Sequence, residues 1–178
     1  IGNDGPSPVP IAHHPDVQRM LMSMKSQTEA GRALAYAVAA DADIAERHPD
    51  VEVRRKRQRR VDLLTPVVKA WSTDVGIEVA STAIQVYGGM GYIEESGVPQ
   101  HLRDARIAAI YEGTNGIQAA DLAGRKVARD GGAAAYDLIA ELRAVDAELA
   151  GGSDTLAAIH RWLSVGADDL AAATDWLV

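Results

Sequence analysis

Residues 61–89 read VDLLTPVVKAWSTDVGIEVASTAIQVYGG, and this stretch decides the fold. Its apolar side chains recur at the three- and four-residue steps that place them on one face of a helix. The glycine pair at its end can take up the left-handed backbone that often closes a helix. We therefore predict a long helix from Val61 to Gly88-Gly89, with Pro66 in its first turns or at a kink. The residues that share the apolar face are Leu64, Val68, Trp71, Val75, Val79, Thr82 and Val86.

The same helical period continues on both sides of this stretch. Upstream, we predict a helix from Pro15 to about Glu46, because proline is well tolerated at the first helical position. The tetrapeptide HPDV occurs at 14–17 and again at 48–51, and we interpret both copies as signals for the start of a helix. No segment carries a convincing strand pattern, so the predicted class is all-α, with antiparallel helices packed as a bundle. Further helices are expected over about 100–110, 116–127, 133–149 and 154–177.

The composition argues against several classes of protein, including nucleic-acid binders and membrane-spanning proteins. The chain has 178 residues, is 47% hydrophobic, carries a net charge of −7 and contains no cysteine. A negative chain is not built to attract nucleic acid or an anionic membrane, and without thiols it forms no disulfide. No apolar run reaches the roughly 18 residues of a membrane span. Because the sequence opens within a Gly/Pro-rich segment and stops within an apolar helical pattern, we expect a piece of a longer protein, cytoplasmic by default.

Two charged clusters offer alternative functions. Residues 54–60, RRKRQRR, hold six positive charges in seven positions. They could form a nucleic-acid patch, but no aromatic residue is interleaved for base stacking, so a solvated connection or a partner-facing surface is the favoured interpretation. His13 and His14 are adjacent before Pro15, a spacing that does not place two ligands on one helix face. We therefore expect neither nucleic-acid binding nor a metal site.

The nonapeptide IYEGTNGIQ, residues 110–118, contains the strongest candidate for a reactive group. Glu112 lies in it between apolar residues and Gly113, and the nonapeptide contains no lysine or arginine. A general base needs an oriented carboxylate whose proton affinity can be tuned by desolvation. An apolar substrate bound against this turn would supply that desolvation, and Gly113 would let the backbone approach it. These features make Glu112 a candidate catalytic base, and a solvated loop glutamate, the commoner case, is the alternative.

The glycine-rich segment QVYGGMGYIEE, residues 85–95, is not a dinucleotide-binding fingerprint. Glu94 occupies the position of the third glycine, and a helix rather than a strand precedes the segment. The ordinary interpretation is a helix end followed by a turn. Even so, backbone N–H groups at three glycines could approach a ligand phosphate.

Taken together, QVYGGMGYIEE, LRDARI at 102–107 and IYEGTNGIQ resemble the acyl-CoA dehydrogenase family in order and spacing. The resemblance covers about 10–127 and is specific to the C-terminal helical domain. HPDVQRMLMSMK and the arginine-rich insertion before LLTPVVKAW resemble its large bacterial branch, which includes 3-methylmercaptopropionyl-CoA dehydrogenase-like and long-chain mycobacterial-type enzymes. The domains expected from it are a loop over 1–14, the four-helix domain over 15–130, and the start of an extra helical segment over 131–178.

The resemblance implies flavin chemistry. Members bind FAD noncovalently, with a neighbouring subunit completing the site, so a homodimer or homotetramer is expected. They oxidise an acyl-CoA thioester to the trans-2-enoyl-CoA and pass electrons to an electron-transfer flavoprotein. The alternative is a helical interaction or scaffold domain that keeps the fold without the chemistry, and the acid at Glu112 argues against it.

The resemblance also implies roles for single residues. Glu112 matches the base that removes the α-proton, and its backbone N–H matches a donor to the thioester carbonyl. Gln85, Gly88 and Gly89 match contacts to the partner subunit's FAD. Thr114 matches a contact to the flavin nucleotide.

Other positions match the substrate slot or depart from the family pattern. Tyr111 and Gly113 match residues that line the acyl and thioester slot, whereas Arg103 and Asp104 are expected to be structural and to orient the loop. Gly116 replaces a Glu or Gln found in some branches, and a cofactor-binding arginine expected just before residue 1 is missing. We therefore expect this chain alone to be inactive.

Overall fold

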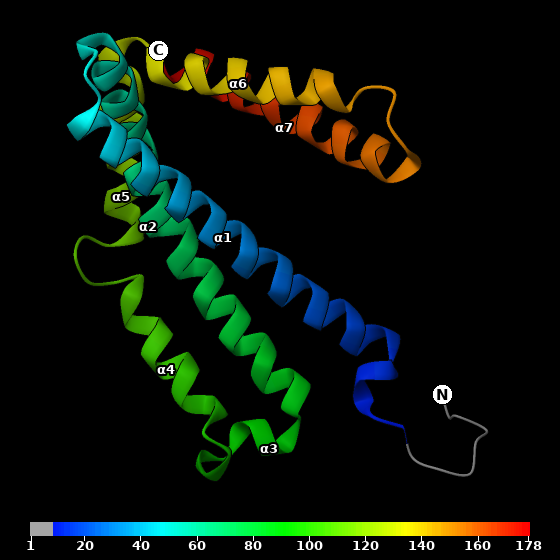
Figure 1. Ribbon diagram of the computed structural model, residues 1–178. Helices are drawn as coiled ribbons and strands as arrows, with labels where there is room; N and C mark the ends of the chain where they lie inside the picture. Colours follow the sequence, from blue (N-terminus) through cyan, green and yellow to red (C-terminus); the bar gives the residue numbers. More distant parts are fainter. Residues whose placement is uncertain (1–8) are drawn as a thin grey trace. The chain divides into compact units, whose positions relative to one another are not determined.

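The computed structural model describes residues 9–178 and is all-α, as predicted, with no strand in that range (Figure 1). Residues 1–8, most of the predicted 1–14 loop, lie outside the described residues, and residues 11–13 of that loop form one 3-10 turn. The elements in chain order are η1 (Ile11–His13), α1 (Pro15–Arg47), α2 (Val51–Tyr87), α3 (Gly89–Tyr92), η2 (Glu94–Ser96), α4 (Val98–Ala108), α5 (Asn115–Asp121), η3 (Leu122–Val127), η4 (Ala128–Asp130), α6 (Ala133–Leu149) and α7 (Asp154–Leu177).

Both HPDV tetrapeptides lie at helix starts. The first places Pro15 at the beginning of α1. In the second, the carboxylate of Asp50 accepts a hydrogen bond of 2.8 Å from the backbone N–H of Glu52, which satisfies one of the donors that a helix start leaves open. The predicted start of α2 at Val61 is therefore wrong: the helix begins ten residues earlier, at Val51, and the basic run is helical.

Pro66 lies in the interior of α2 and not in its first turns. It is buried, and because it has no N–H it cannot bond to the carbonyl of Asp62 one turn earlier. On the preceding residue, the hydroxyl of Thr65 donates 2.7 Å to the carbonyl of Val61. Packing of the apolar face, rather than an unbroken ladder of backbone bonds, therefore stabilises this part of α2.

The chain divides into two compact units, and the first comprises Ile1–Tyr36 and Val68–Thr114. It contains the first part of α1, the last part of α2, α3, η2 and α4. Gln27 of α1 donates a hydrogen bond of 3.2 Å to Glu78 of α2, and Gly31 approaches Ser72, so the two helices run antiparallel here. The buried apolar residues of this unit include Met20, Val75, Ala80 and Val98.

The second unit comprises Ala37–Val67 and Asn115–Val178. Leu63 of α2 packs with Val127, Ala134 and Ala135 in its core, and Leu122, Leu138 and Leu177 surround them. The single helix predicted over 116–127 is instead α5 followed by η3, a π-helical segment. A π-helical turn widens the helix locally, which the sequence pattern did not indicate.

Helices α6 and α7 form an antiparallel hairpin within the second unit, with the bounds that the sequence predicted. Three polar pairs cross between them: Tyr136–Asp175 at 2.6 Å, Arg143–Asp168 at 3.1 Å and Asp146–His160 at 2.6 Å. The apolar contact includes small side chains, since Ala135 is only 3% exposed and Ala167 only 1%.

Candidate active site

The turn after α4, residues 109–114, carries the predicted base. The backbone N–H groups of Ile110 and Tyr111 both donate to the carbonyl of Ile107, at 2.9 and 3.0 Å, and end the helix. Among residues 9–178, Glu112 is the one residue other than glycine with a positive φ, 54°. Such a left-handed backbone costs a non-glycine residue about 1–3 kcal/mol and persists only where its surroundings hold it. Glu112 is exposed, and Gly113 follows it at a φ of 82°.

Lys69 of α2 holds this turn from outside. Its ammonium Nζ donates a hydrogen bond of 2.8 Å to the carbonyl oxygen of Gly113. Charge-assisted bonds of this kind are roughly twice as strong as neutral ones. No sequence pattern points to Lys69, because it lies 44 residues from Gly113 and only the fold of the first unit brings the two together.

The predicted site residues form two sets: one set lies together on the turn after α4, and the other lies elsewhere, at the end of α2. Tyr111, Glu112, Gly113 and Thr114 lie together on the exposed turn beside Lys69. The second set comprises Gln85, Gly88 and Gly89, all exposed at the far end of α2. Gln85 is sixteen residues beyond Lys69, or about 24 Å along the helix axis. This chain therefore does not bring the two sets to one point.

The positions after α2 require glycine for different physical reasons. Gly88 has φ 61° and ψ −143°, a region open essentially to glycine alone. At buried Gly91 a Cβ atom would lie 2.4 Å from the carbonyl oxygen of Ile84, so α3 packs directly against the end of α2. The N–H groups of Gly88 and Gly91 bond to carbonyls of Gln85 and Gly88 within the turn. Of the three predicted phosphate-facing glycines, Gly89 is the one at the N-terminus of α3, where helical N–H groups lack intrahelical acceptors.

Arg103 of α4 contacts the segment before the helix, whereas Asp104 contacts a residue of α4 itself. Arg103 pairs with Glu94 at 3.4 Å and bonds Gln100, which also donates 2.6 Å to the carboxylate of Asp104. Arg103 thus links α4 to η2, while the contact of Asp104 stays within the helix, and the prediction that the two residues orient the loop stays a prediction.

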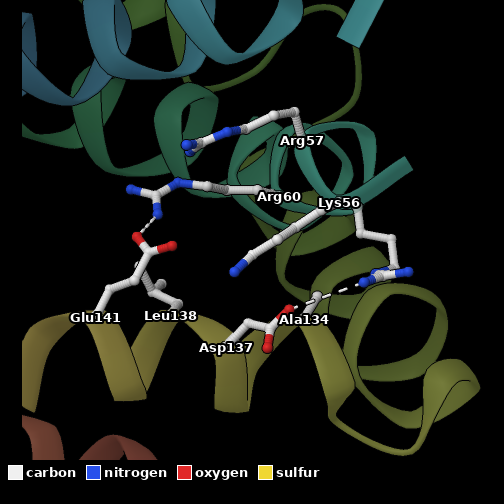
Figure 2. Close-up of a pocket in the computed structure, with 8 residues that line it drawn as sticks. Lys56, Arg57, Arg60, Ala134, Asp137, Leu138 and Glu141 are labelled. Atoms are coloured by element: carbon white, nitrogen blue, oxygen red, sulfur yellow. Dashed lines mark hydrogen bonds and ion pairs between the residues drawn. The ribbon is translucent and has the colours of Figure 1, made fainter. Parts of the chain in front are cut away.

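The basic run of α2 is used within the second unit. Asp41 of α1 is only 5% exposed, and it pairs with Arg57 at 3.0 Å and Arg60 at 2.9 Å. Figure 2 shows Arg60 extended toward Glu141 of α6, with which it also pairs, and Arg59 pairs with Asp137 at 3.8 Å. The cavity between these side chains is about 10 Å³, room for at most one water molecule. The run thus links helices of its own chain.

Within residues 9–178, no group of three or more histidine or acidic side chains is arranged to hold a metal ion. In the same range, no helix combines the length and the apolar character that crossing a bilayer requires.

Comparisons with known proteins agree with the motifs. The family described as "Acyl-CoA dehydrogenase, C-terminal domain" matches residues 7–127. The 3-methylmercaptopropionyl-CoA dehydrogenase of Ruegeria pomeroyi is 51% identical over 144 residues, covering 81% of this chain and 24% of that protein. The broad-specificity linear acyl-CoA dehydrogenase FadE5 of Mycobacterium tuberculosis is 39% identical over 128 residues, covering 71% of this chain and 21% of that protein.

A solved structure, the apo form of Bd2924, matches with a TM-score of 0.69 at 21% identity and covers 97% of this chain and 35% of that one. At that identity the likeness shows the fold alone. The chain spans about a quarter of the length of the curated relatives that it matches. Because the family match covers most of the chain and includes each of the three motifs, the chain belongs to the acyl-CoA dehydrogenase family, whose C-terminal domain it carries over residues 7–127.

Proposed function

We propose that this chain supplies the catalytic base of an FAD-dependent acyl-CoA dehydrogenase, and that the base is Glu112. One observation carries the proposal: Glu112 stands exposed on a turn in a left-handed backbone conformation that is costly for its residue type. Strained residues of this kind cluster where a side chain must be aimed. Lys69 also donates a hydrogen bond to the carbonyl of the next residue, Gly113, and this bond restrains the turn that carries Glu112.

The chemistry proposed for the chain's own groups is the activation of an acyl-CoA thioester. The carboxylate of Glu112 takes the proton from the α-carbon. The backbone N–H of Glu112 donates to the thioester carbonyl and stabilises the enolate-like charge that develops there, as a preorganised donor does. Tyr111 and Gly113 line the slot on either side of the base, and the small Gly113 lets the thioester approach the backbone.

The residues proposed for FAD fit such a group. Gln85, Gly88 and Gly89 are exposed at the end of α2, and at Gly88 and Gly89 a Cβ atom would meet nothing within 4 Å, which leaves room beside the backbone. Bound FAD supplies the acceptor for the hydride from the β-carbon. Since Gln85 and Thr114 belong to the two separated sets, they are proposed to touch FAD molecules of different subunits.

The remaining elements of the proposal concern the whole protein. It is a homodimer or homotetramer in the cytoplasm, oxidises acyl-CoA to trans-2-enoyl-CoA, and passes electrons to an electron-transfer flavoprotein. The relatives named for 3-methylmercaptopropionyl-CoA and linear acyl-CoA make an acyl-CoA thioester the proposed substrate class. The chain alone, which spans about a quarter of those relatives, is proposed to be inactive.

The test uses the complete protein that contains this domain, with Glu112→Gln and, as a control, Glu29→Gln on α1. Glu29 is a largely exposed acid of the same unit, paired with Lys25. Flavin absorbance is recorded under anaerobic conditions while a panel of acyl-CoA thioesters is titrated. We expect the wild type and the Glu29 variant to bleach with some chain lengths, and E112Q to retain FAD without bleaching. Equal bleaching in all three would place the base elsewhere. Failure of the wild type to bind flavin would favour the scaffold alternative.

A further inference from the structure

We propose that Lys69 is a positioning residue for Glu112: its ammonium fixes the turn in the conformation that aims the carboxylate. The proposal rests on the proposed role of Glu112 as the base. Lys69 contacts the backbone of the turn at Gly113 and is assigned no contact with substrate or cofactor.

The backbone of the turn explains why an external anchor is needed. Glu112 and Gly113 both have positive φ, at 54° and 82°. The left-handed region is unfavourable for Glu112, whereas Gly113 can adopt many backbone conformations and so imposes none on its neighbour. A bond to the Gly113 carbonyl restrains both residues, because that oxygen changes direction when either φ angle changes. The hydrogen bond from Lys69 is such a restraint.

The anchor stands on a helix. Lys69 lies in the part of α2 that belongs to the first unit, and its own carbonyl also accepts a bond of 2.8 Å from the hydroxyl of Thr73. The residue is half-buried, and lysine side chains in such places commonly lay their aliphatic stem along the protein while the ammonium stays at the surface. Sites whose supporting residues stand on helices are held more accurately than sites supported by loops alone.

The chemistry predicts a particular kinetic signature. A base must be aligned with the α-proton in the transition state. A turn that samples several conformations therefore lowers kcat more than it weakens substrate binding. Losing one charge-assisted bond at a partly exposed position is expected to lower kcat roughly tenfold, with KM changed less than threefold. Arginine also donates charged hydrogen bonds, so Lys69→Arg should recover a large part of the loss.

The experiment compares Lys69→Met and Lys69→Arg in the complete flavoprotein with Lys25→Met as the matched control. Lys25 is an exposed lysine of the same unit, on α1, and pairs with Glu29. Steady-state kinetics is combined with amide hydrogen exchange of the peptide that covers residues 109–114. We expect K69M to exchange at least tenfold faster in that peptide and to lose kcat, K69R to stand between K69M and the wild type, and K25M to match the wild type.

The outcomes separate this proposal from the proposed function. Exchange in K69M equal to that in K25M overturns the positioning role, whatever the activity. A loss of order in K69R as large as in K69M also overturns it, because the cationic donor would then make no difference. If E112Q keeps full activity, the proposed base is wrong, and with it the proposed target of Lys69, even where exchange in the turn responds to Lys69→Met.

Discussion

Arg60 lies 2.9 Å from the buried carboxylate of Asp41, and the same guanidinium also pairs with Glu141. One side chain of α2 thereby joins α1 to α6 in the second unit. Removing one partner of a buried ion pair is costly, because the remaining charge stays in a poorly solvated place.

Replacing Arg60 by Met should therefore lower the free energy of unfolding by about 2 kcal/mol, less than a lone buried pair because Arg57 still contacts Asp41. Arg55→Met is the control, since Arg55 makes an exposed pair with Glu52 and its loss should cost under about 0.5 kcal/mol. Urea unfolding monitored by helical circular dichroism measures both. Equal midpoints for the two variants would contradict a structural role for Arg60.

Tyr136 should confer a pH dependence on the second unit. Its hydroxyl donates a hydrogen bond of 2.6 Å to Asp175, and this bond to the carboxylate, together with partial desolvation and the negative charge, raises the pKa of the exposed Tyr136 above its usual 10.0. A raised pKa in the folded state means that the bond stabilises the fold fully below about pH 10, and that this stability is lost as the pH rises through the folded pKa.

We therefore expect Tyr136→Phe to be less stable than the wild type at pH 7–9, with the difference shrinking above pH 10. Thermal unfolding across this range measures the difference, and absorbance near 295 nm follows ionisation of the phenol. Tyr36→Phe serves as the control, since Tyr36 is exposed in the first unit. A difference between wild type and Y136F that stays constant to pH 11.5 would argue against the bond.

Gly91→Ala should damage the end of α2 more than another glycine substitution in the first unit. A Cβ atom at position 91 would meet the backbone oxygen of Ile84 at 2.4 Å, which no rotamer can relieve. We expect a loss of about 2 kcal/mol or more. At Gly76, inside α2, a Cβ atom meets nothing within 4 Å, so Gly76→Ala should stabilise by roughly 0.5–1 kcal/mol. Thermal unfolding of the two variants gives the comparison, and a tolerated alanine at position 91 would mean that α3 is packed differently.

Glu112→Gly should abolish activity and raise the stability of the fold. Glycine relieves the left-handed strain at φ 54°, offset in part by its greater entropy in the unfolded chain, so a net gain of about 1 kcal/mol is expected while dehydrogenation is lost. Glu112→Gln keeps the strain and should leave stability within about 0.5 kcal/mol of the wild type. Differential scanning calorimetry separates the two. A destabilised glycine variant would show that contacts of the glutamate side chain outweigh its backbone strain.

Helical periodicity predicted most of the fold because it is a local property. The start of α1 at Pro15 and the bounds of α6 and α7 follow from proline, glycine and apolar spacing. The start of α2 was misplaced because the arginine-rich run has no apolar face to reveal its period, although the second HPDV had marked the right position. The π-helical turn at 122–127, where Val127 is buried in the core and Leu122 packs against it, has no local sequence signal.

The candidate site was predictable to the extent that a single segment carries it. Tyr111, Glu112, Gly113 and Thr114 are contiguous, so their proximity is given by the chain itself. The backbone strain at Glu112 and the bond from Lys69 depend on tertiary structure, and no spacing rule links residues 44 positions apart. Whether these residues act as the family motif implies stays a prediction for the experiments above.

The α6–α7 hairpin buries Ala135 and Ile139 of α6 and Ala167 of α7, and the small alanines tolerate a shift of one helix along the other better than a large side chain does. The three crossing pairs, Tyr136–Asp175, Arg143–Asp168 and Asp146–His160, do not have that tolerance. A slip of one residue turns a helix face by about 100° and separates all three at once. The three pairs therefore select the register of the hairpin. Losing one pair leaves two to select it. Losing all three should leave a hairpin that is still helical but adopts several registers.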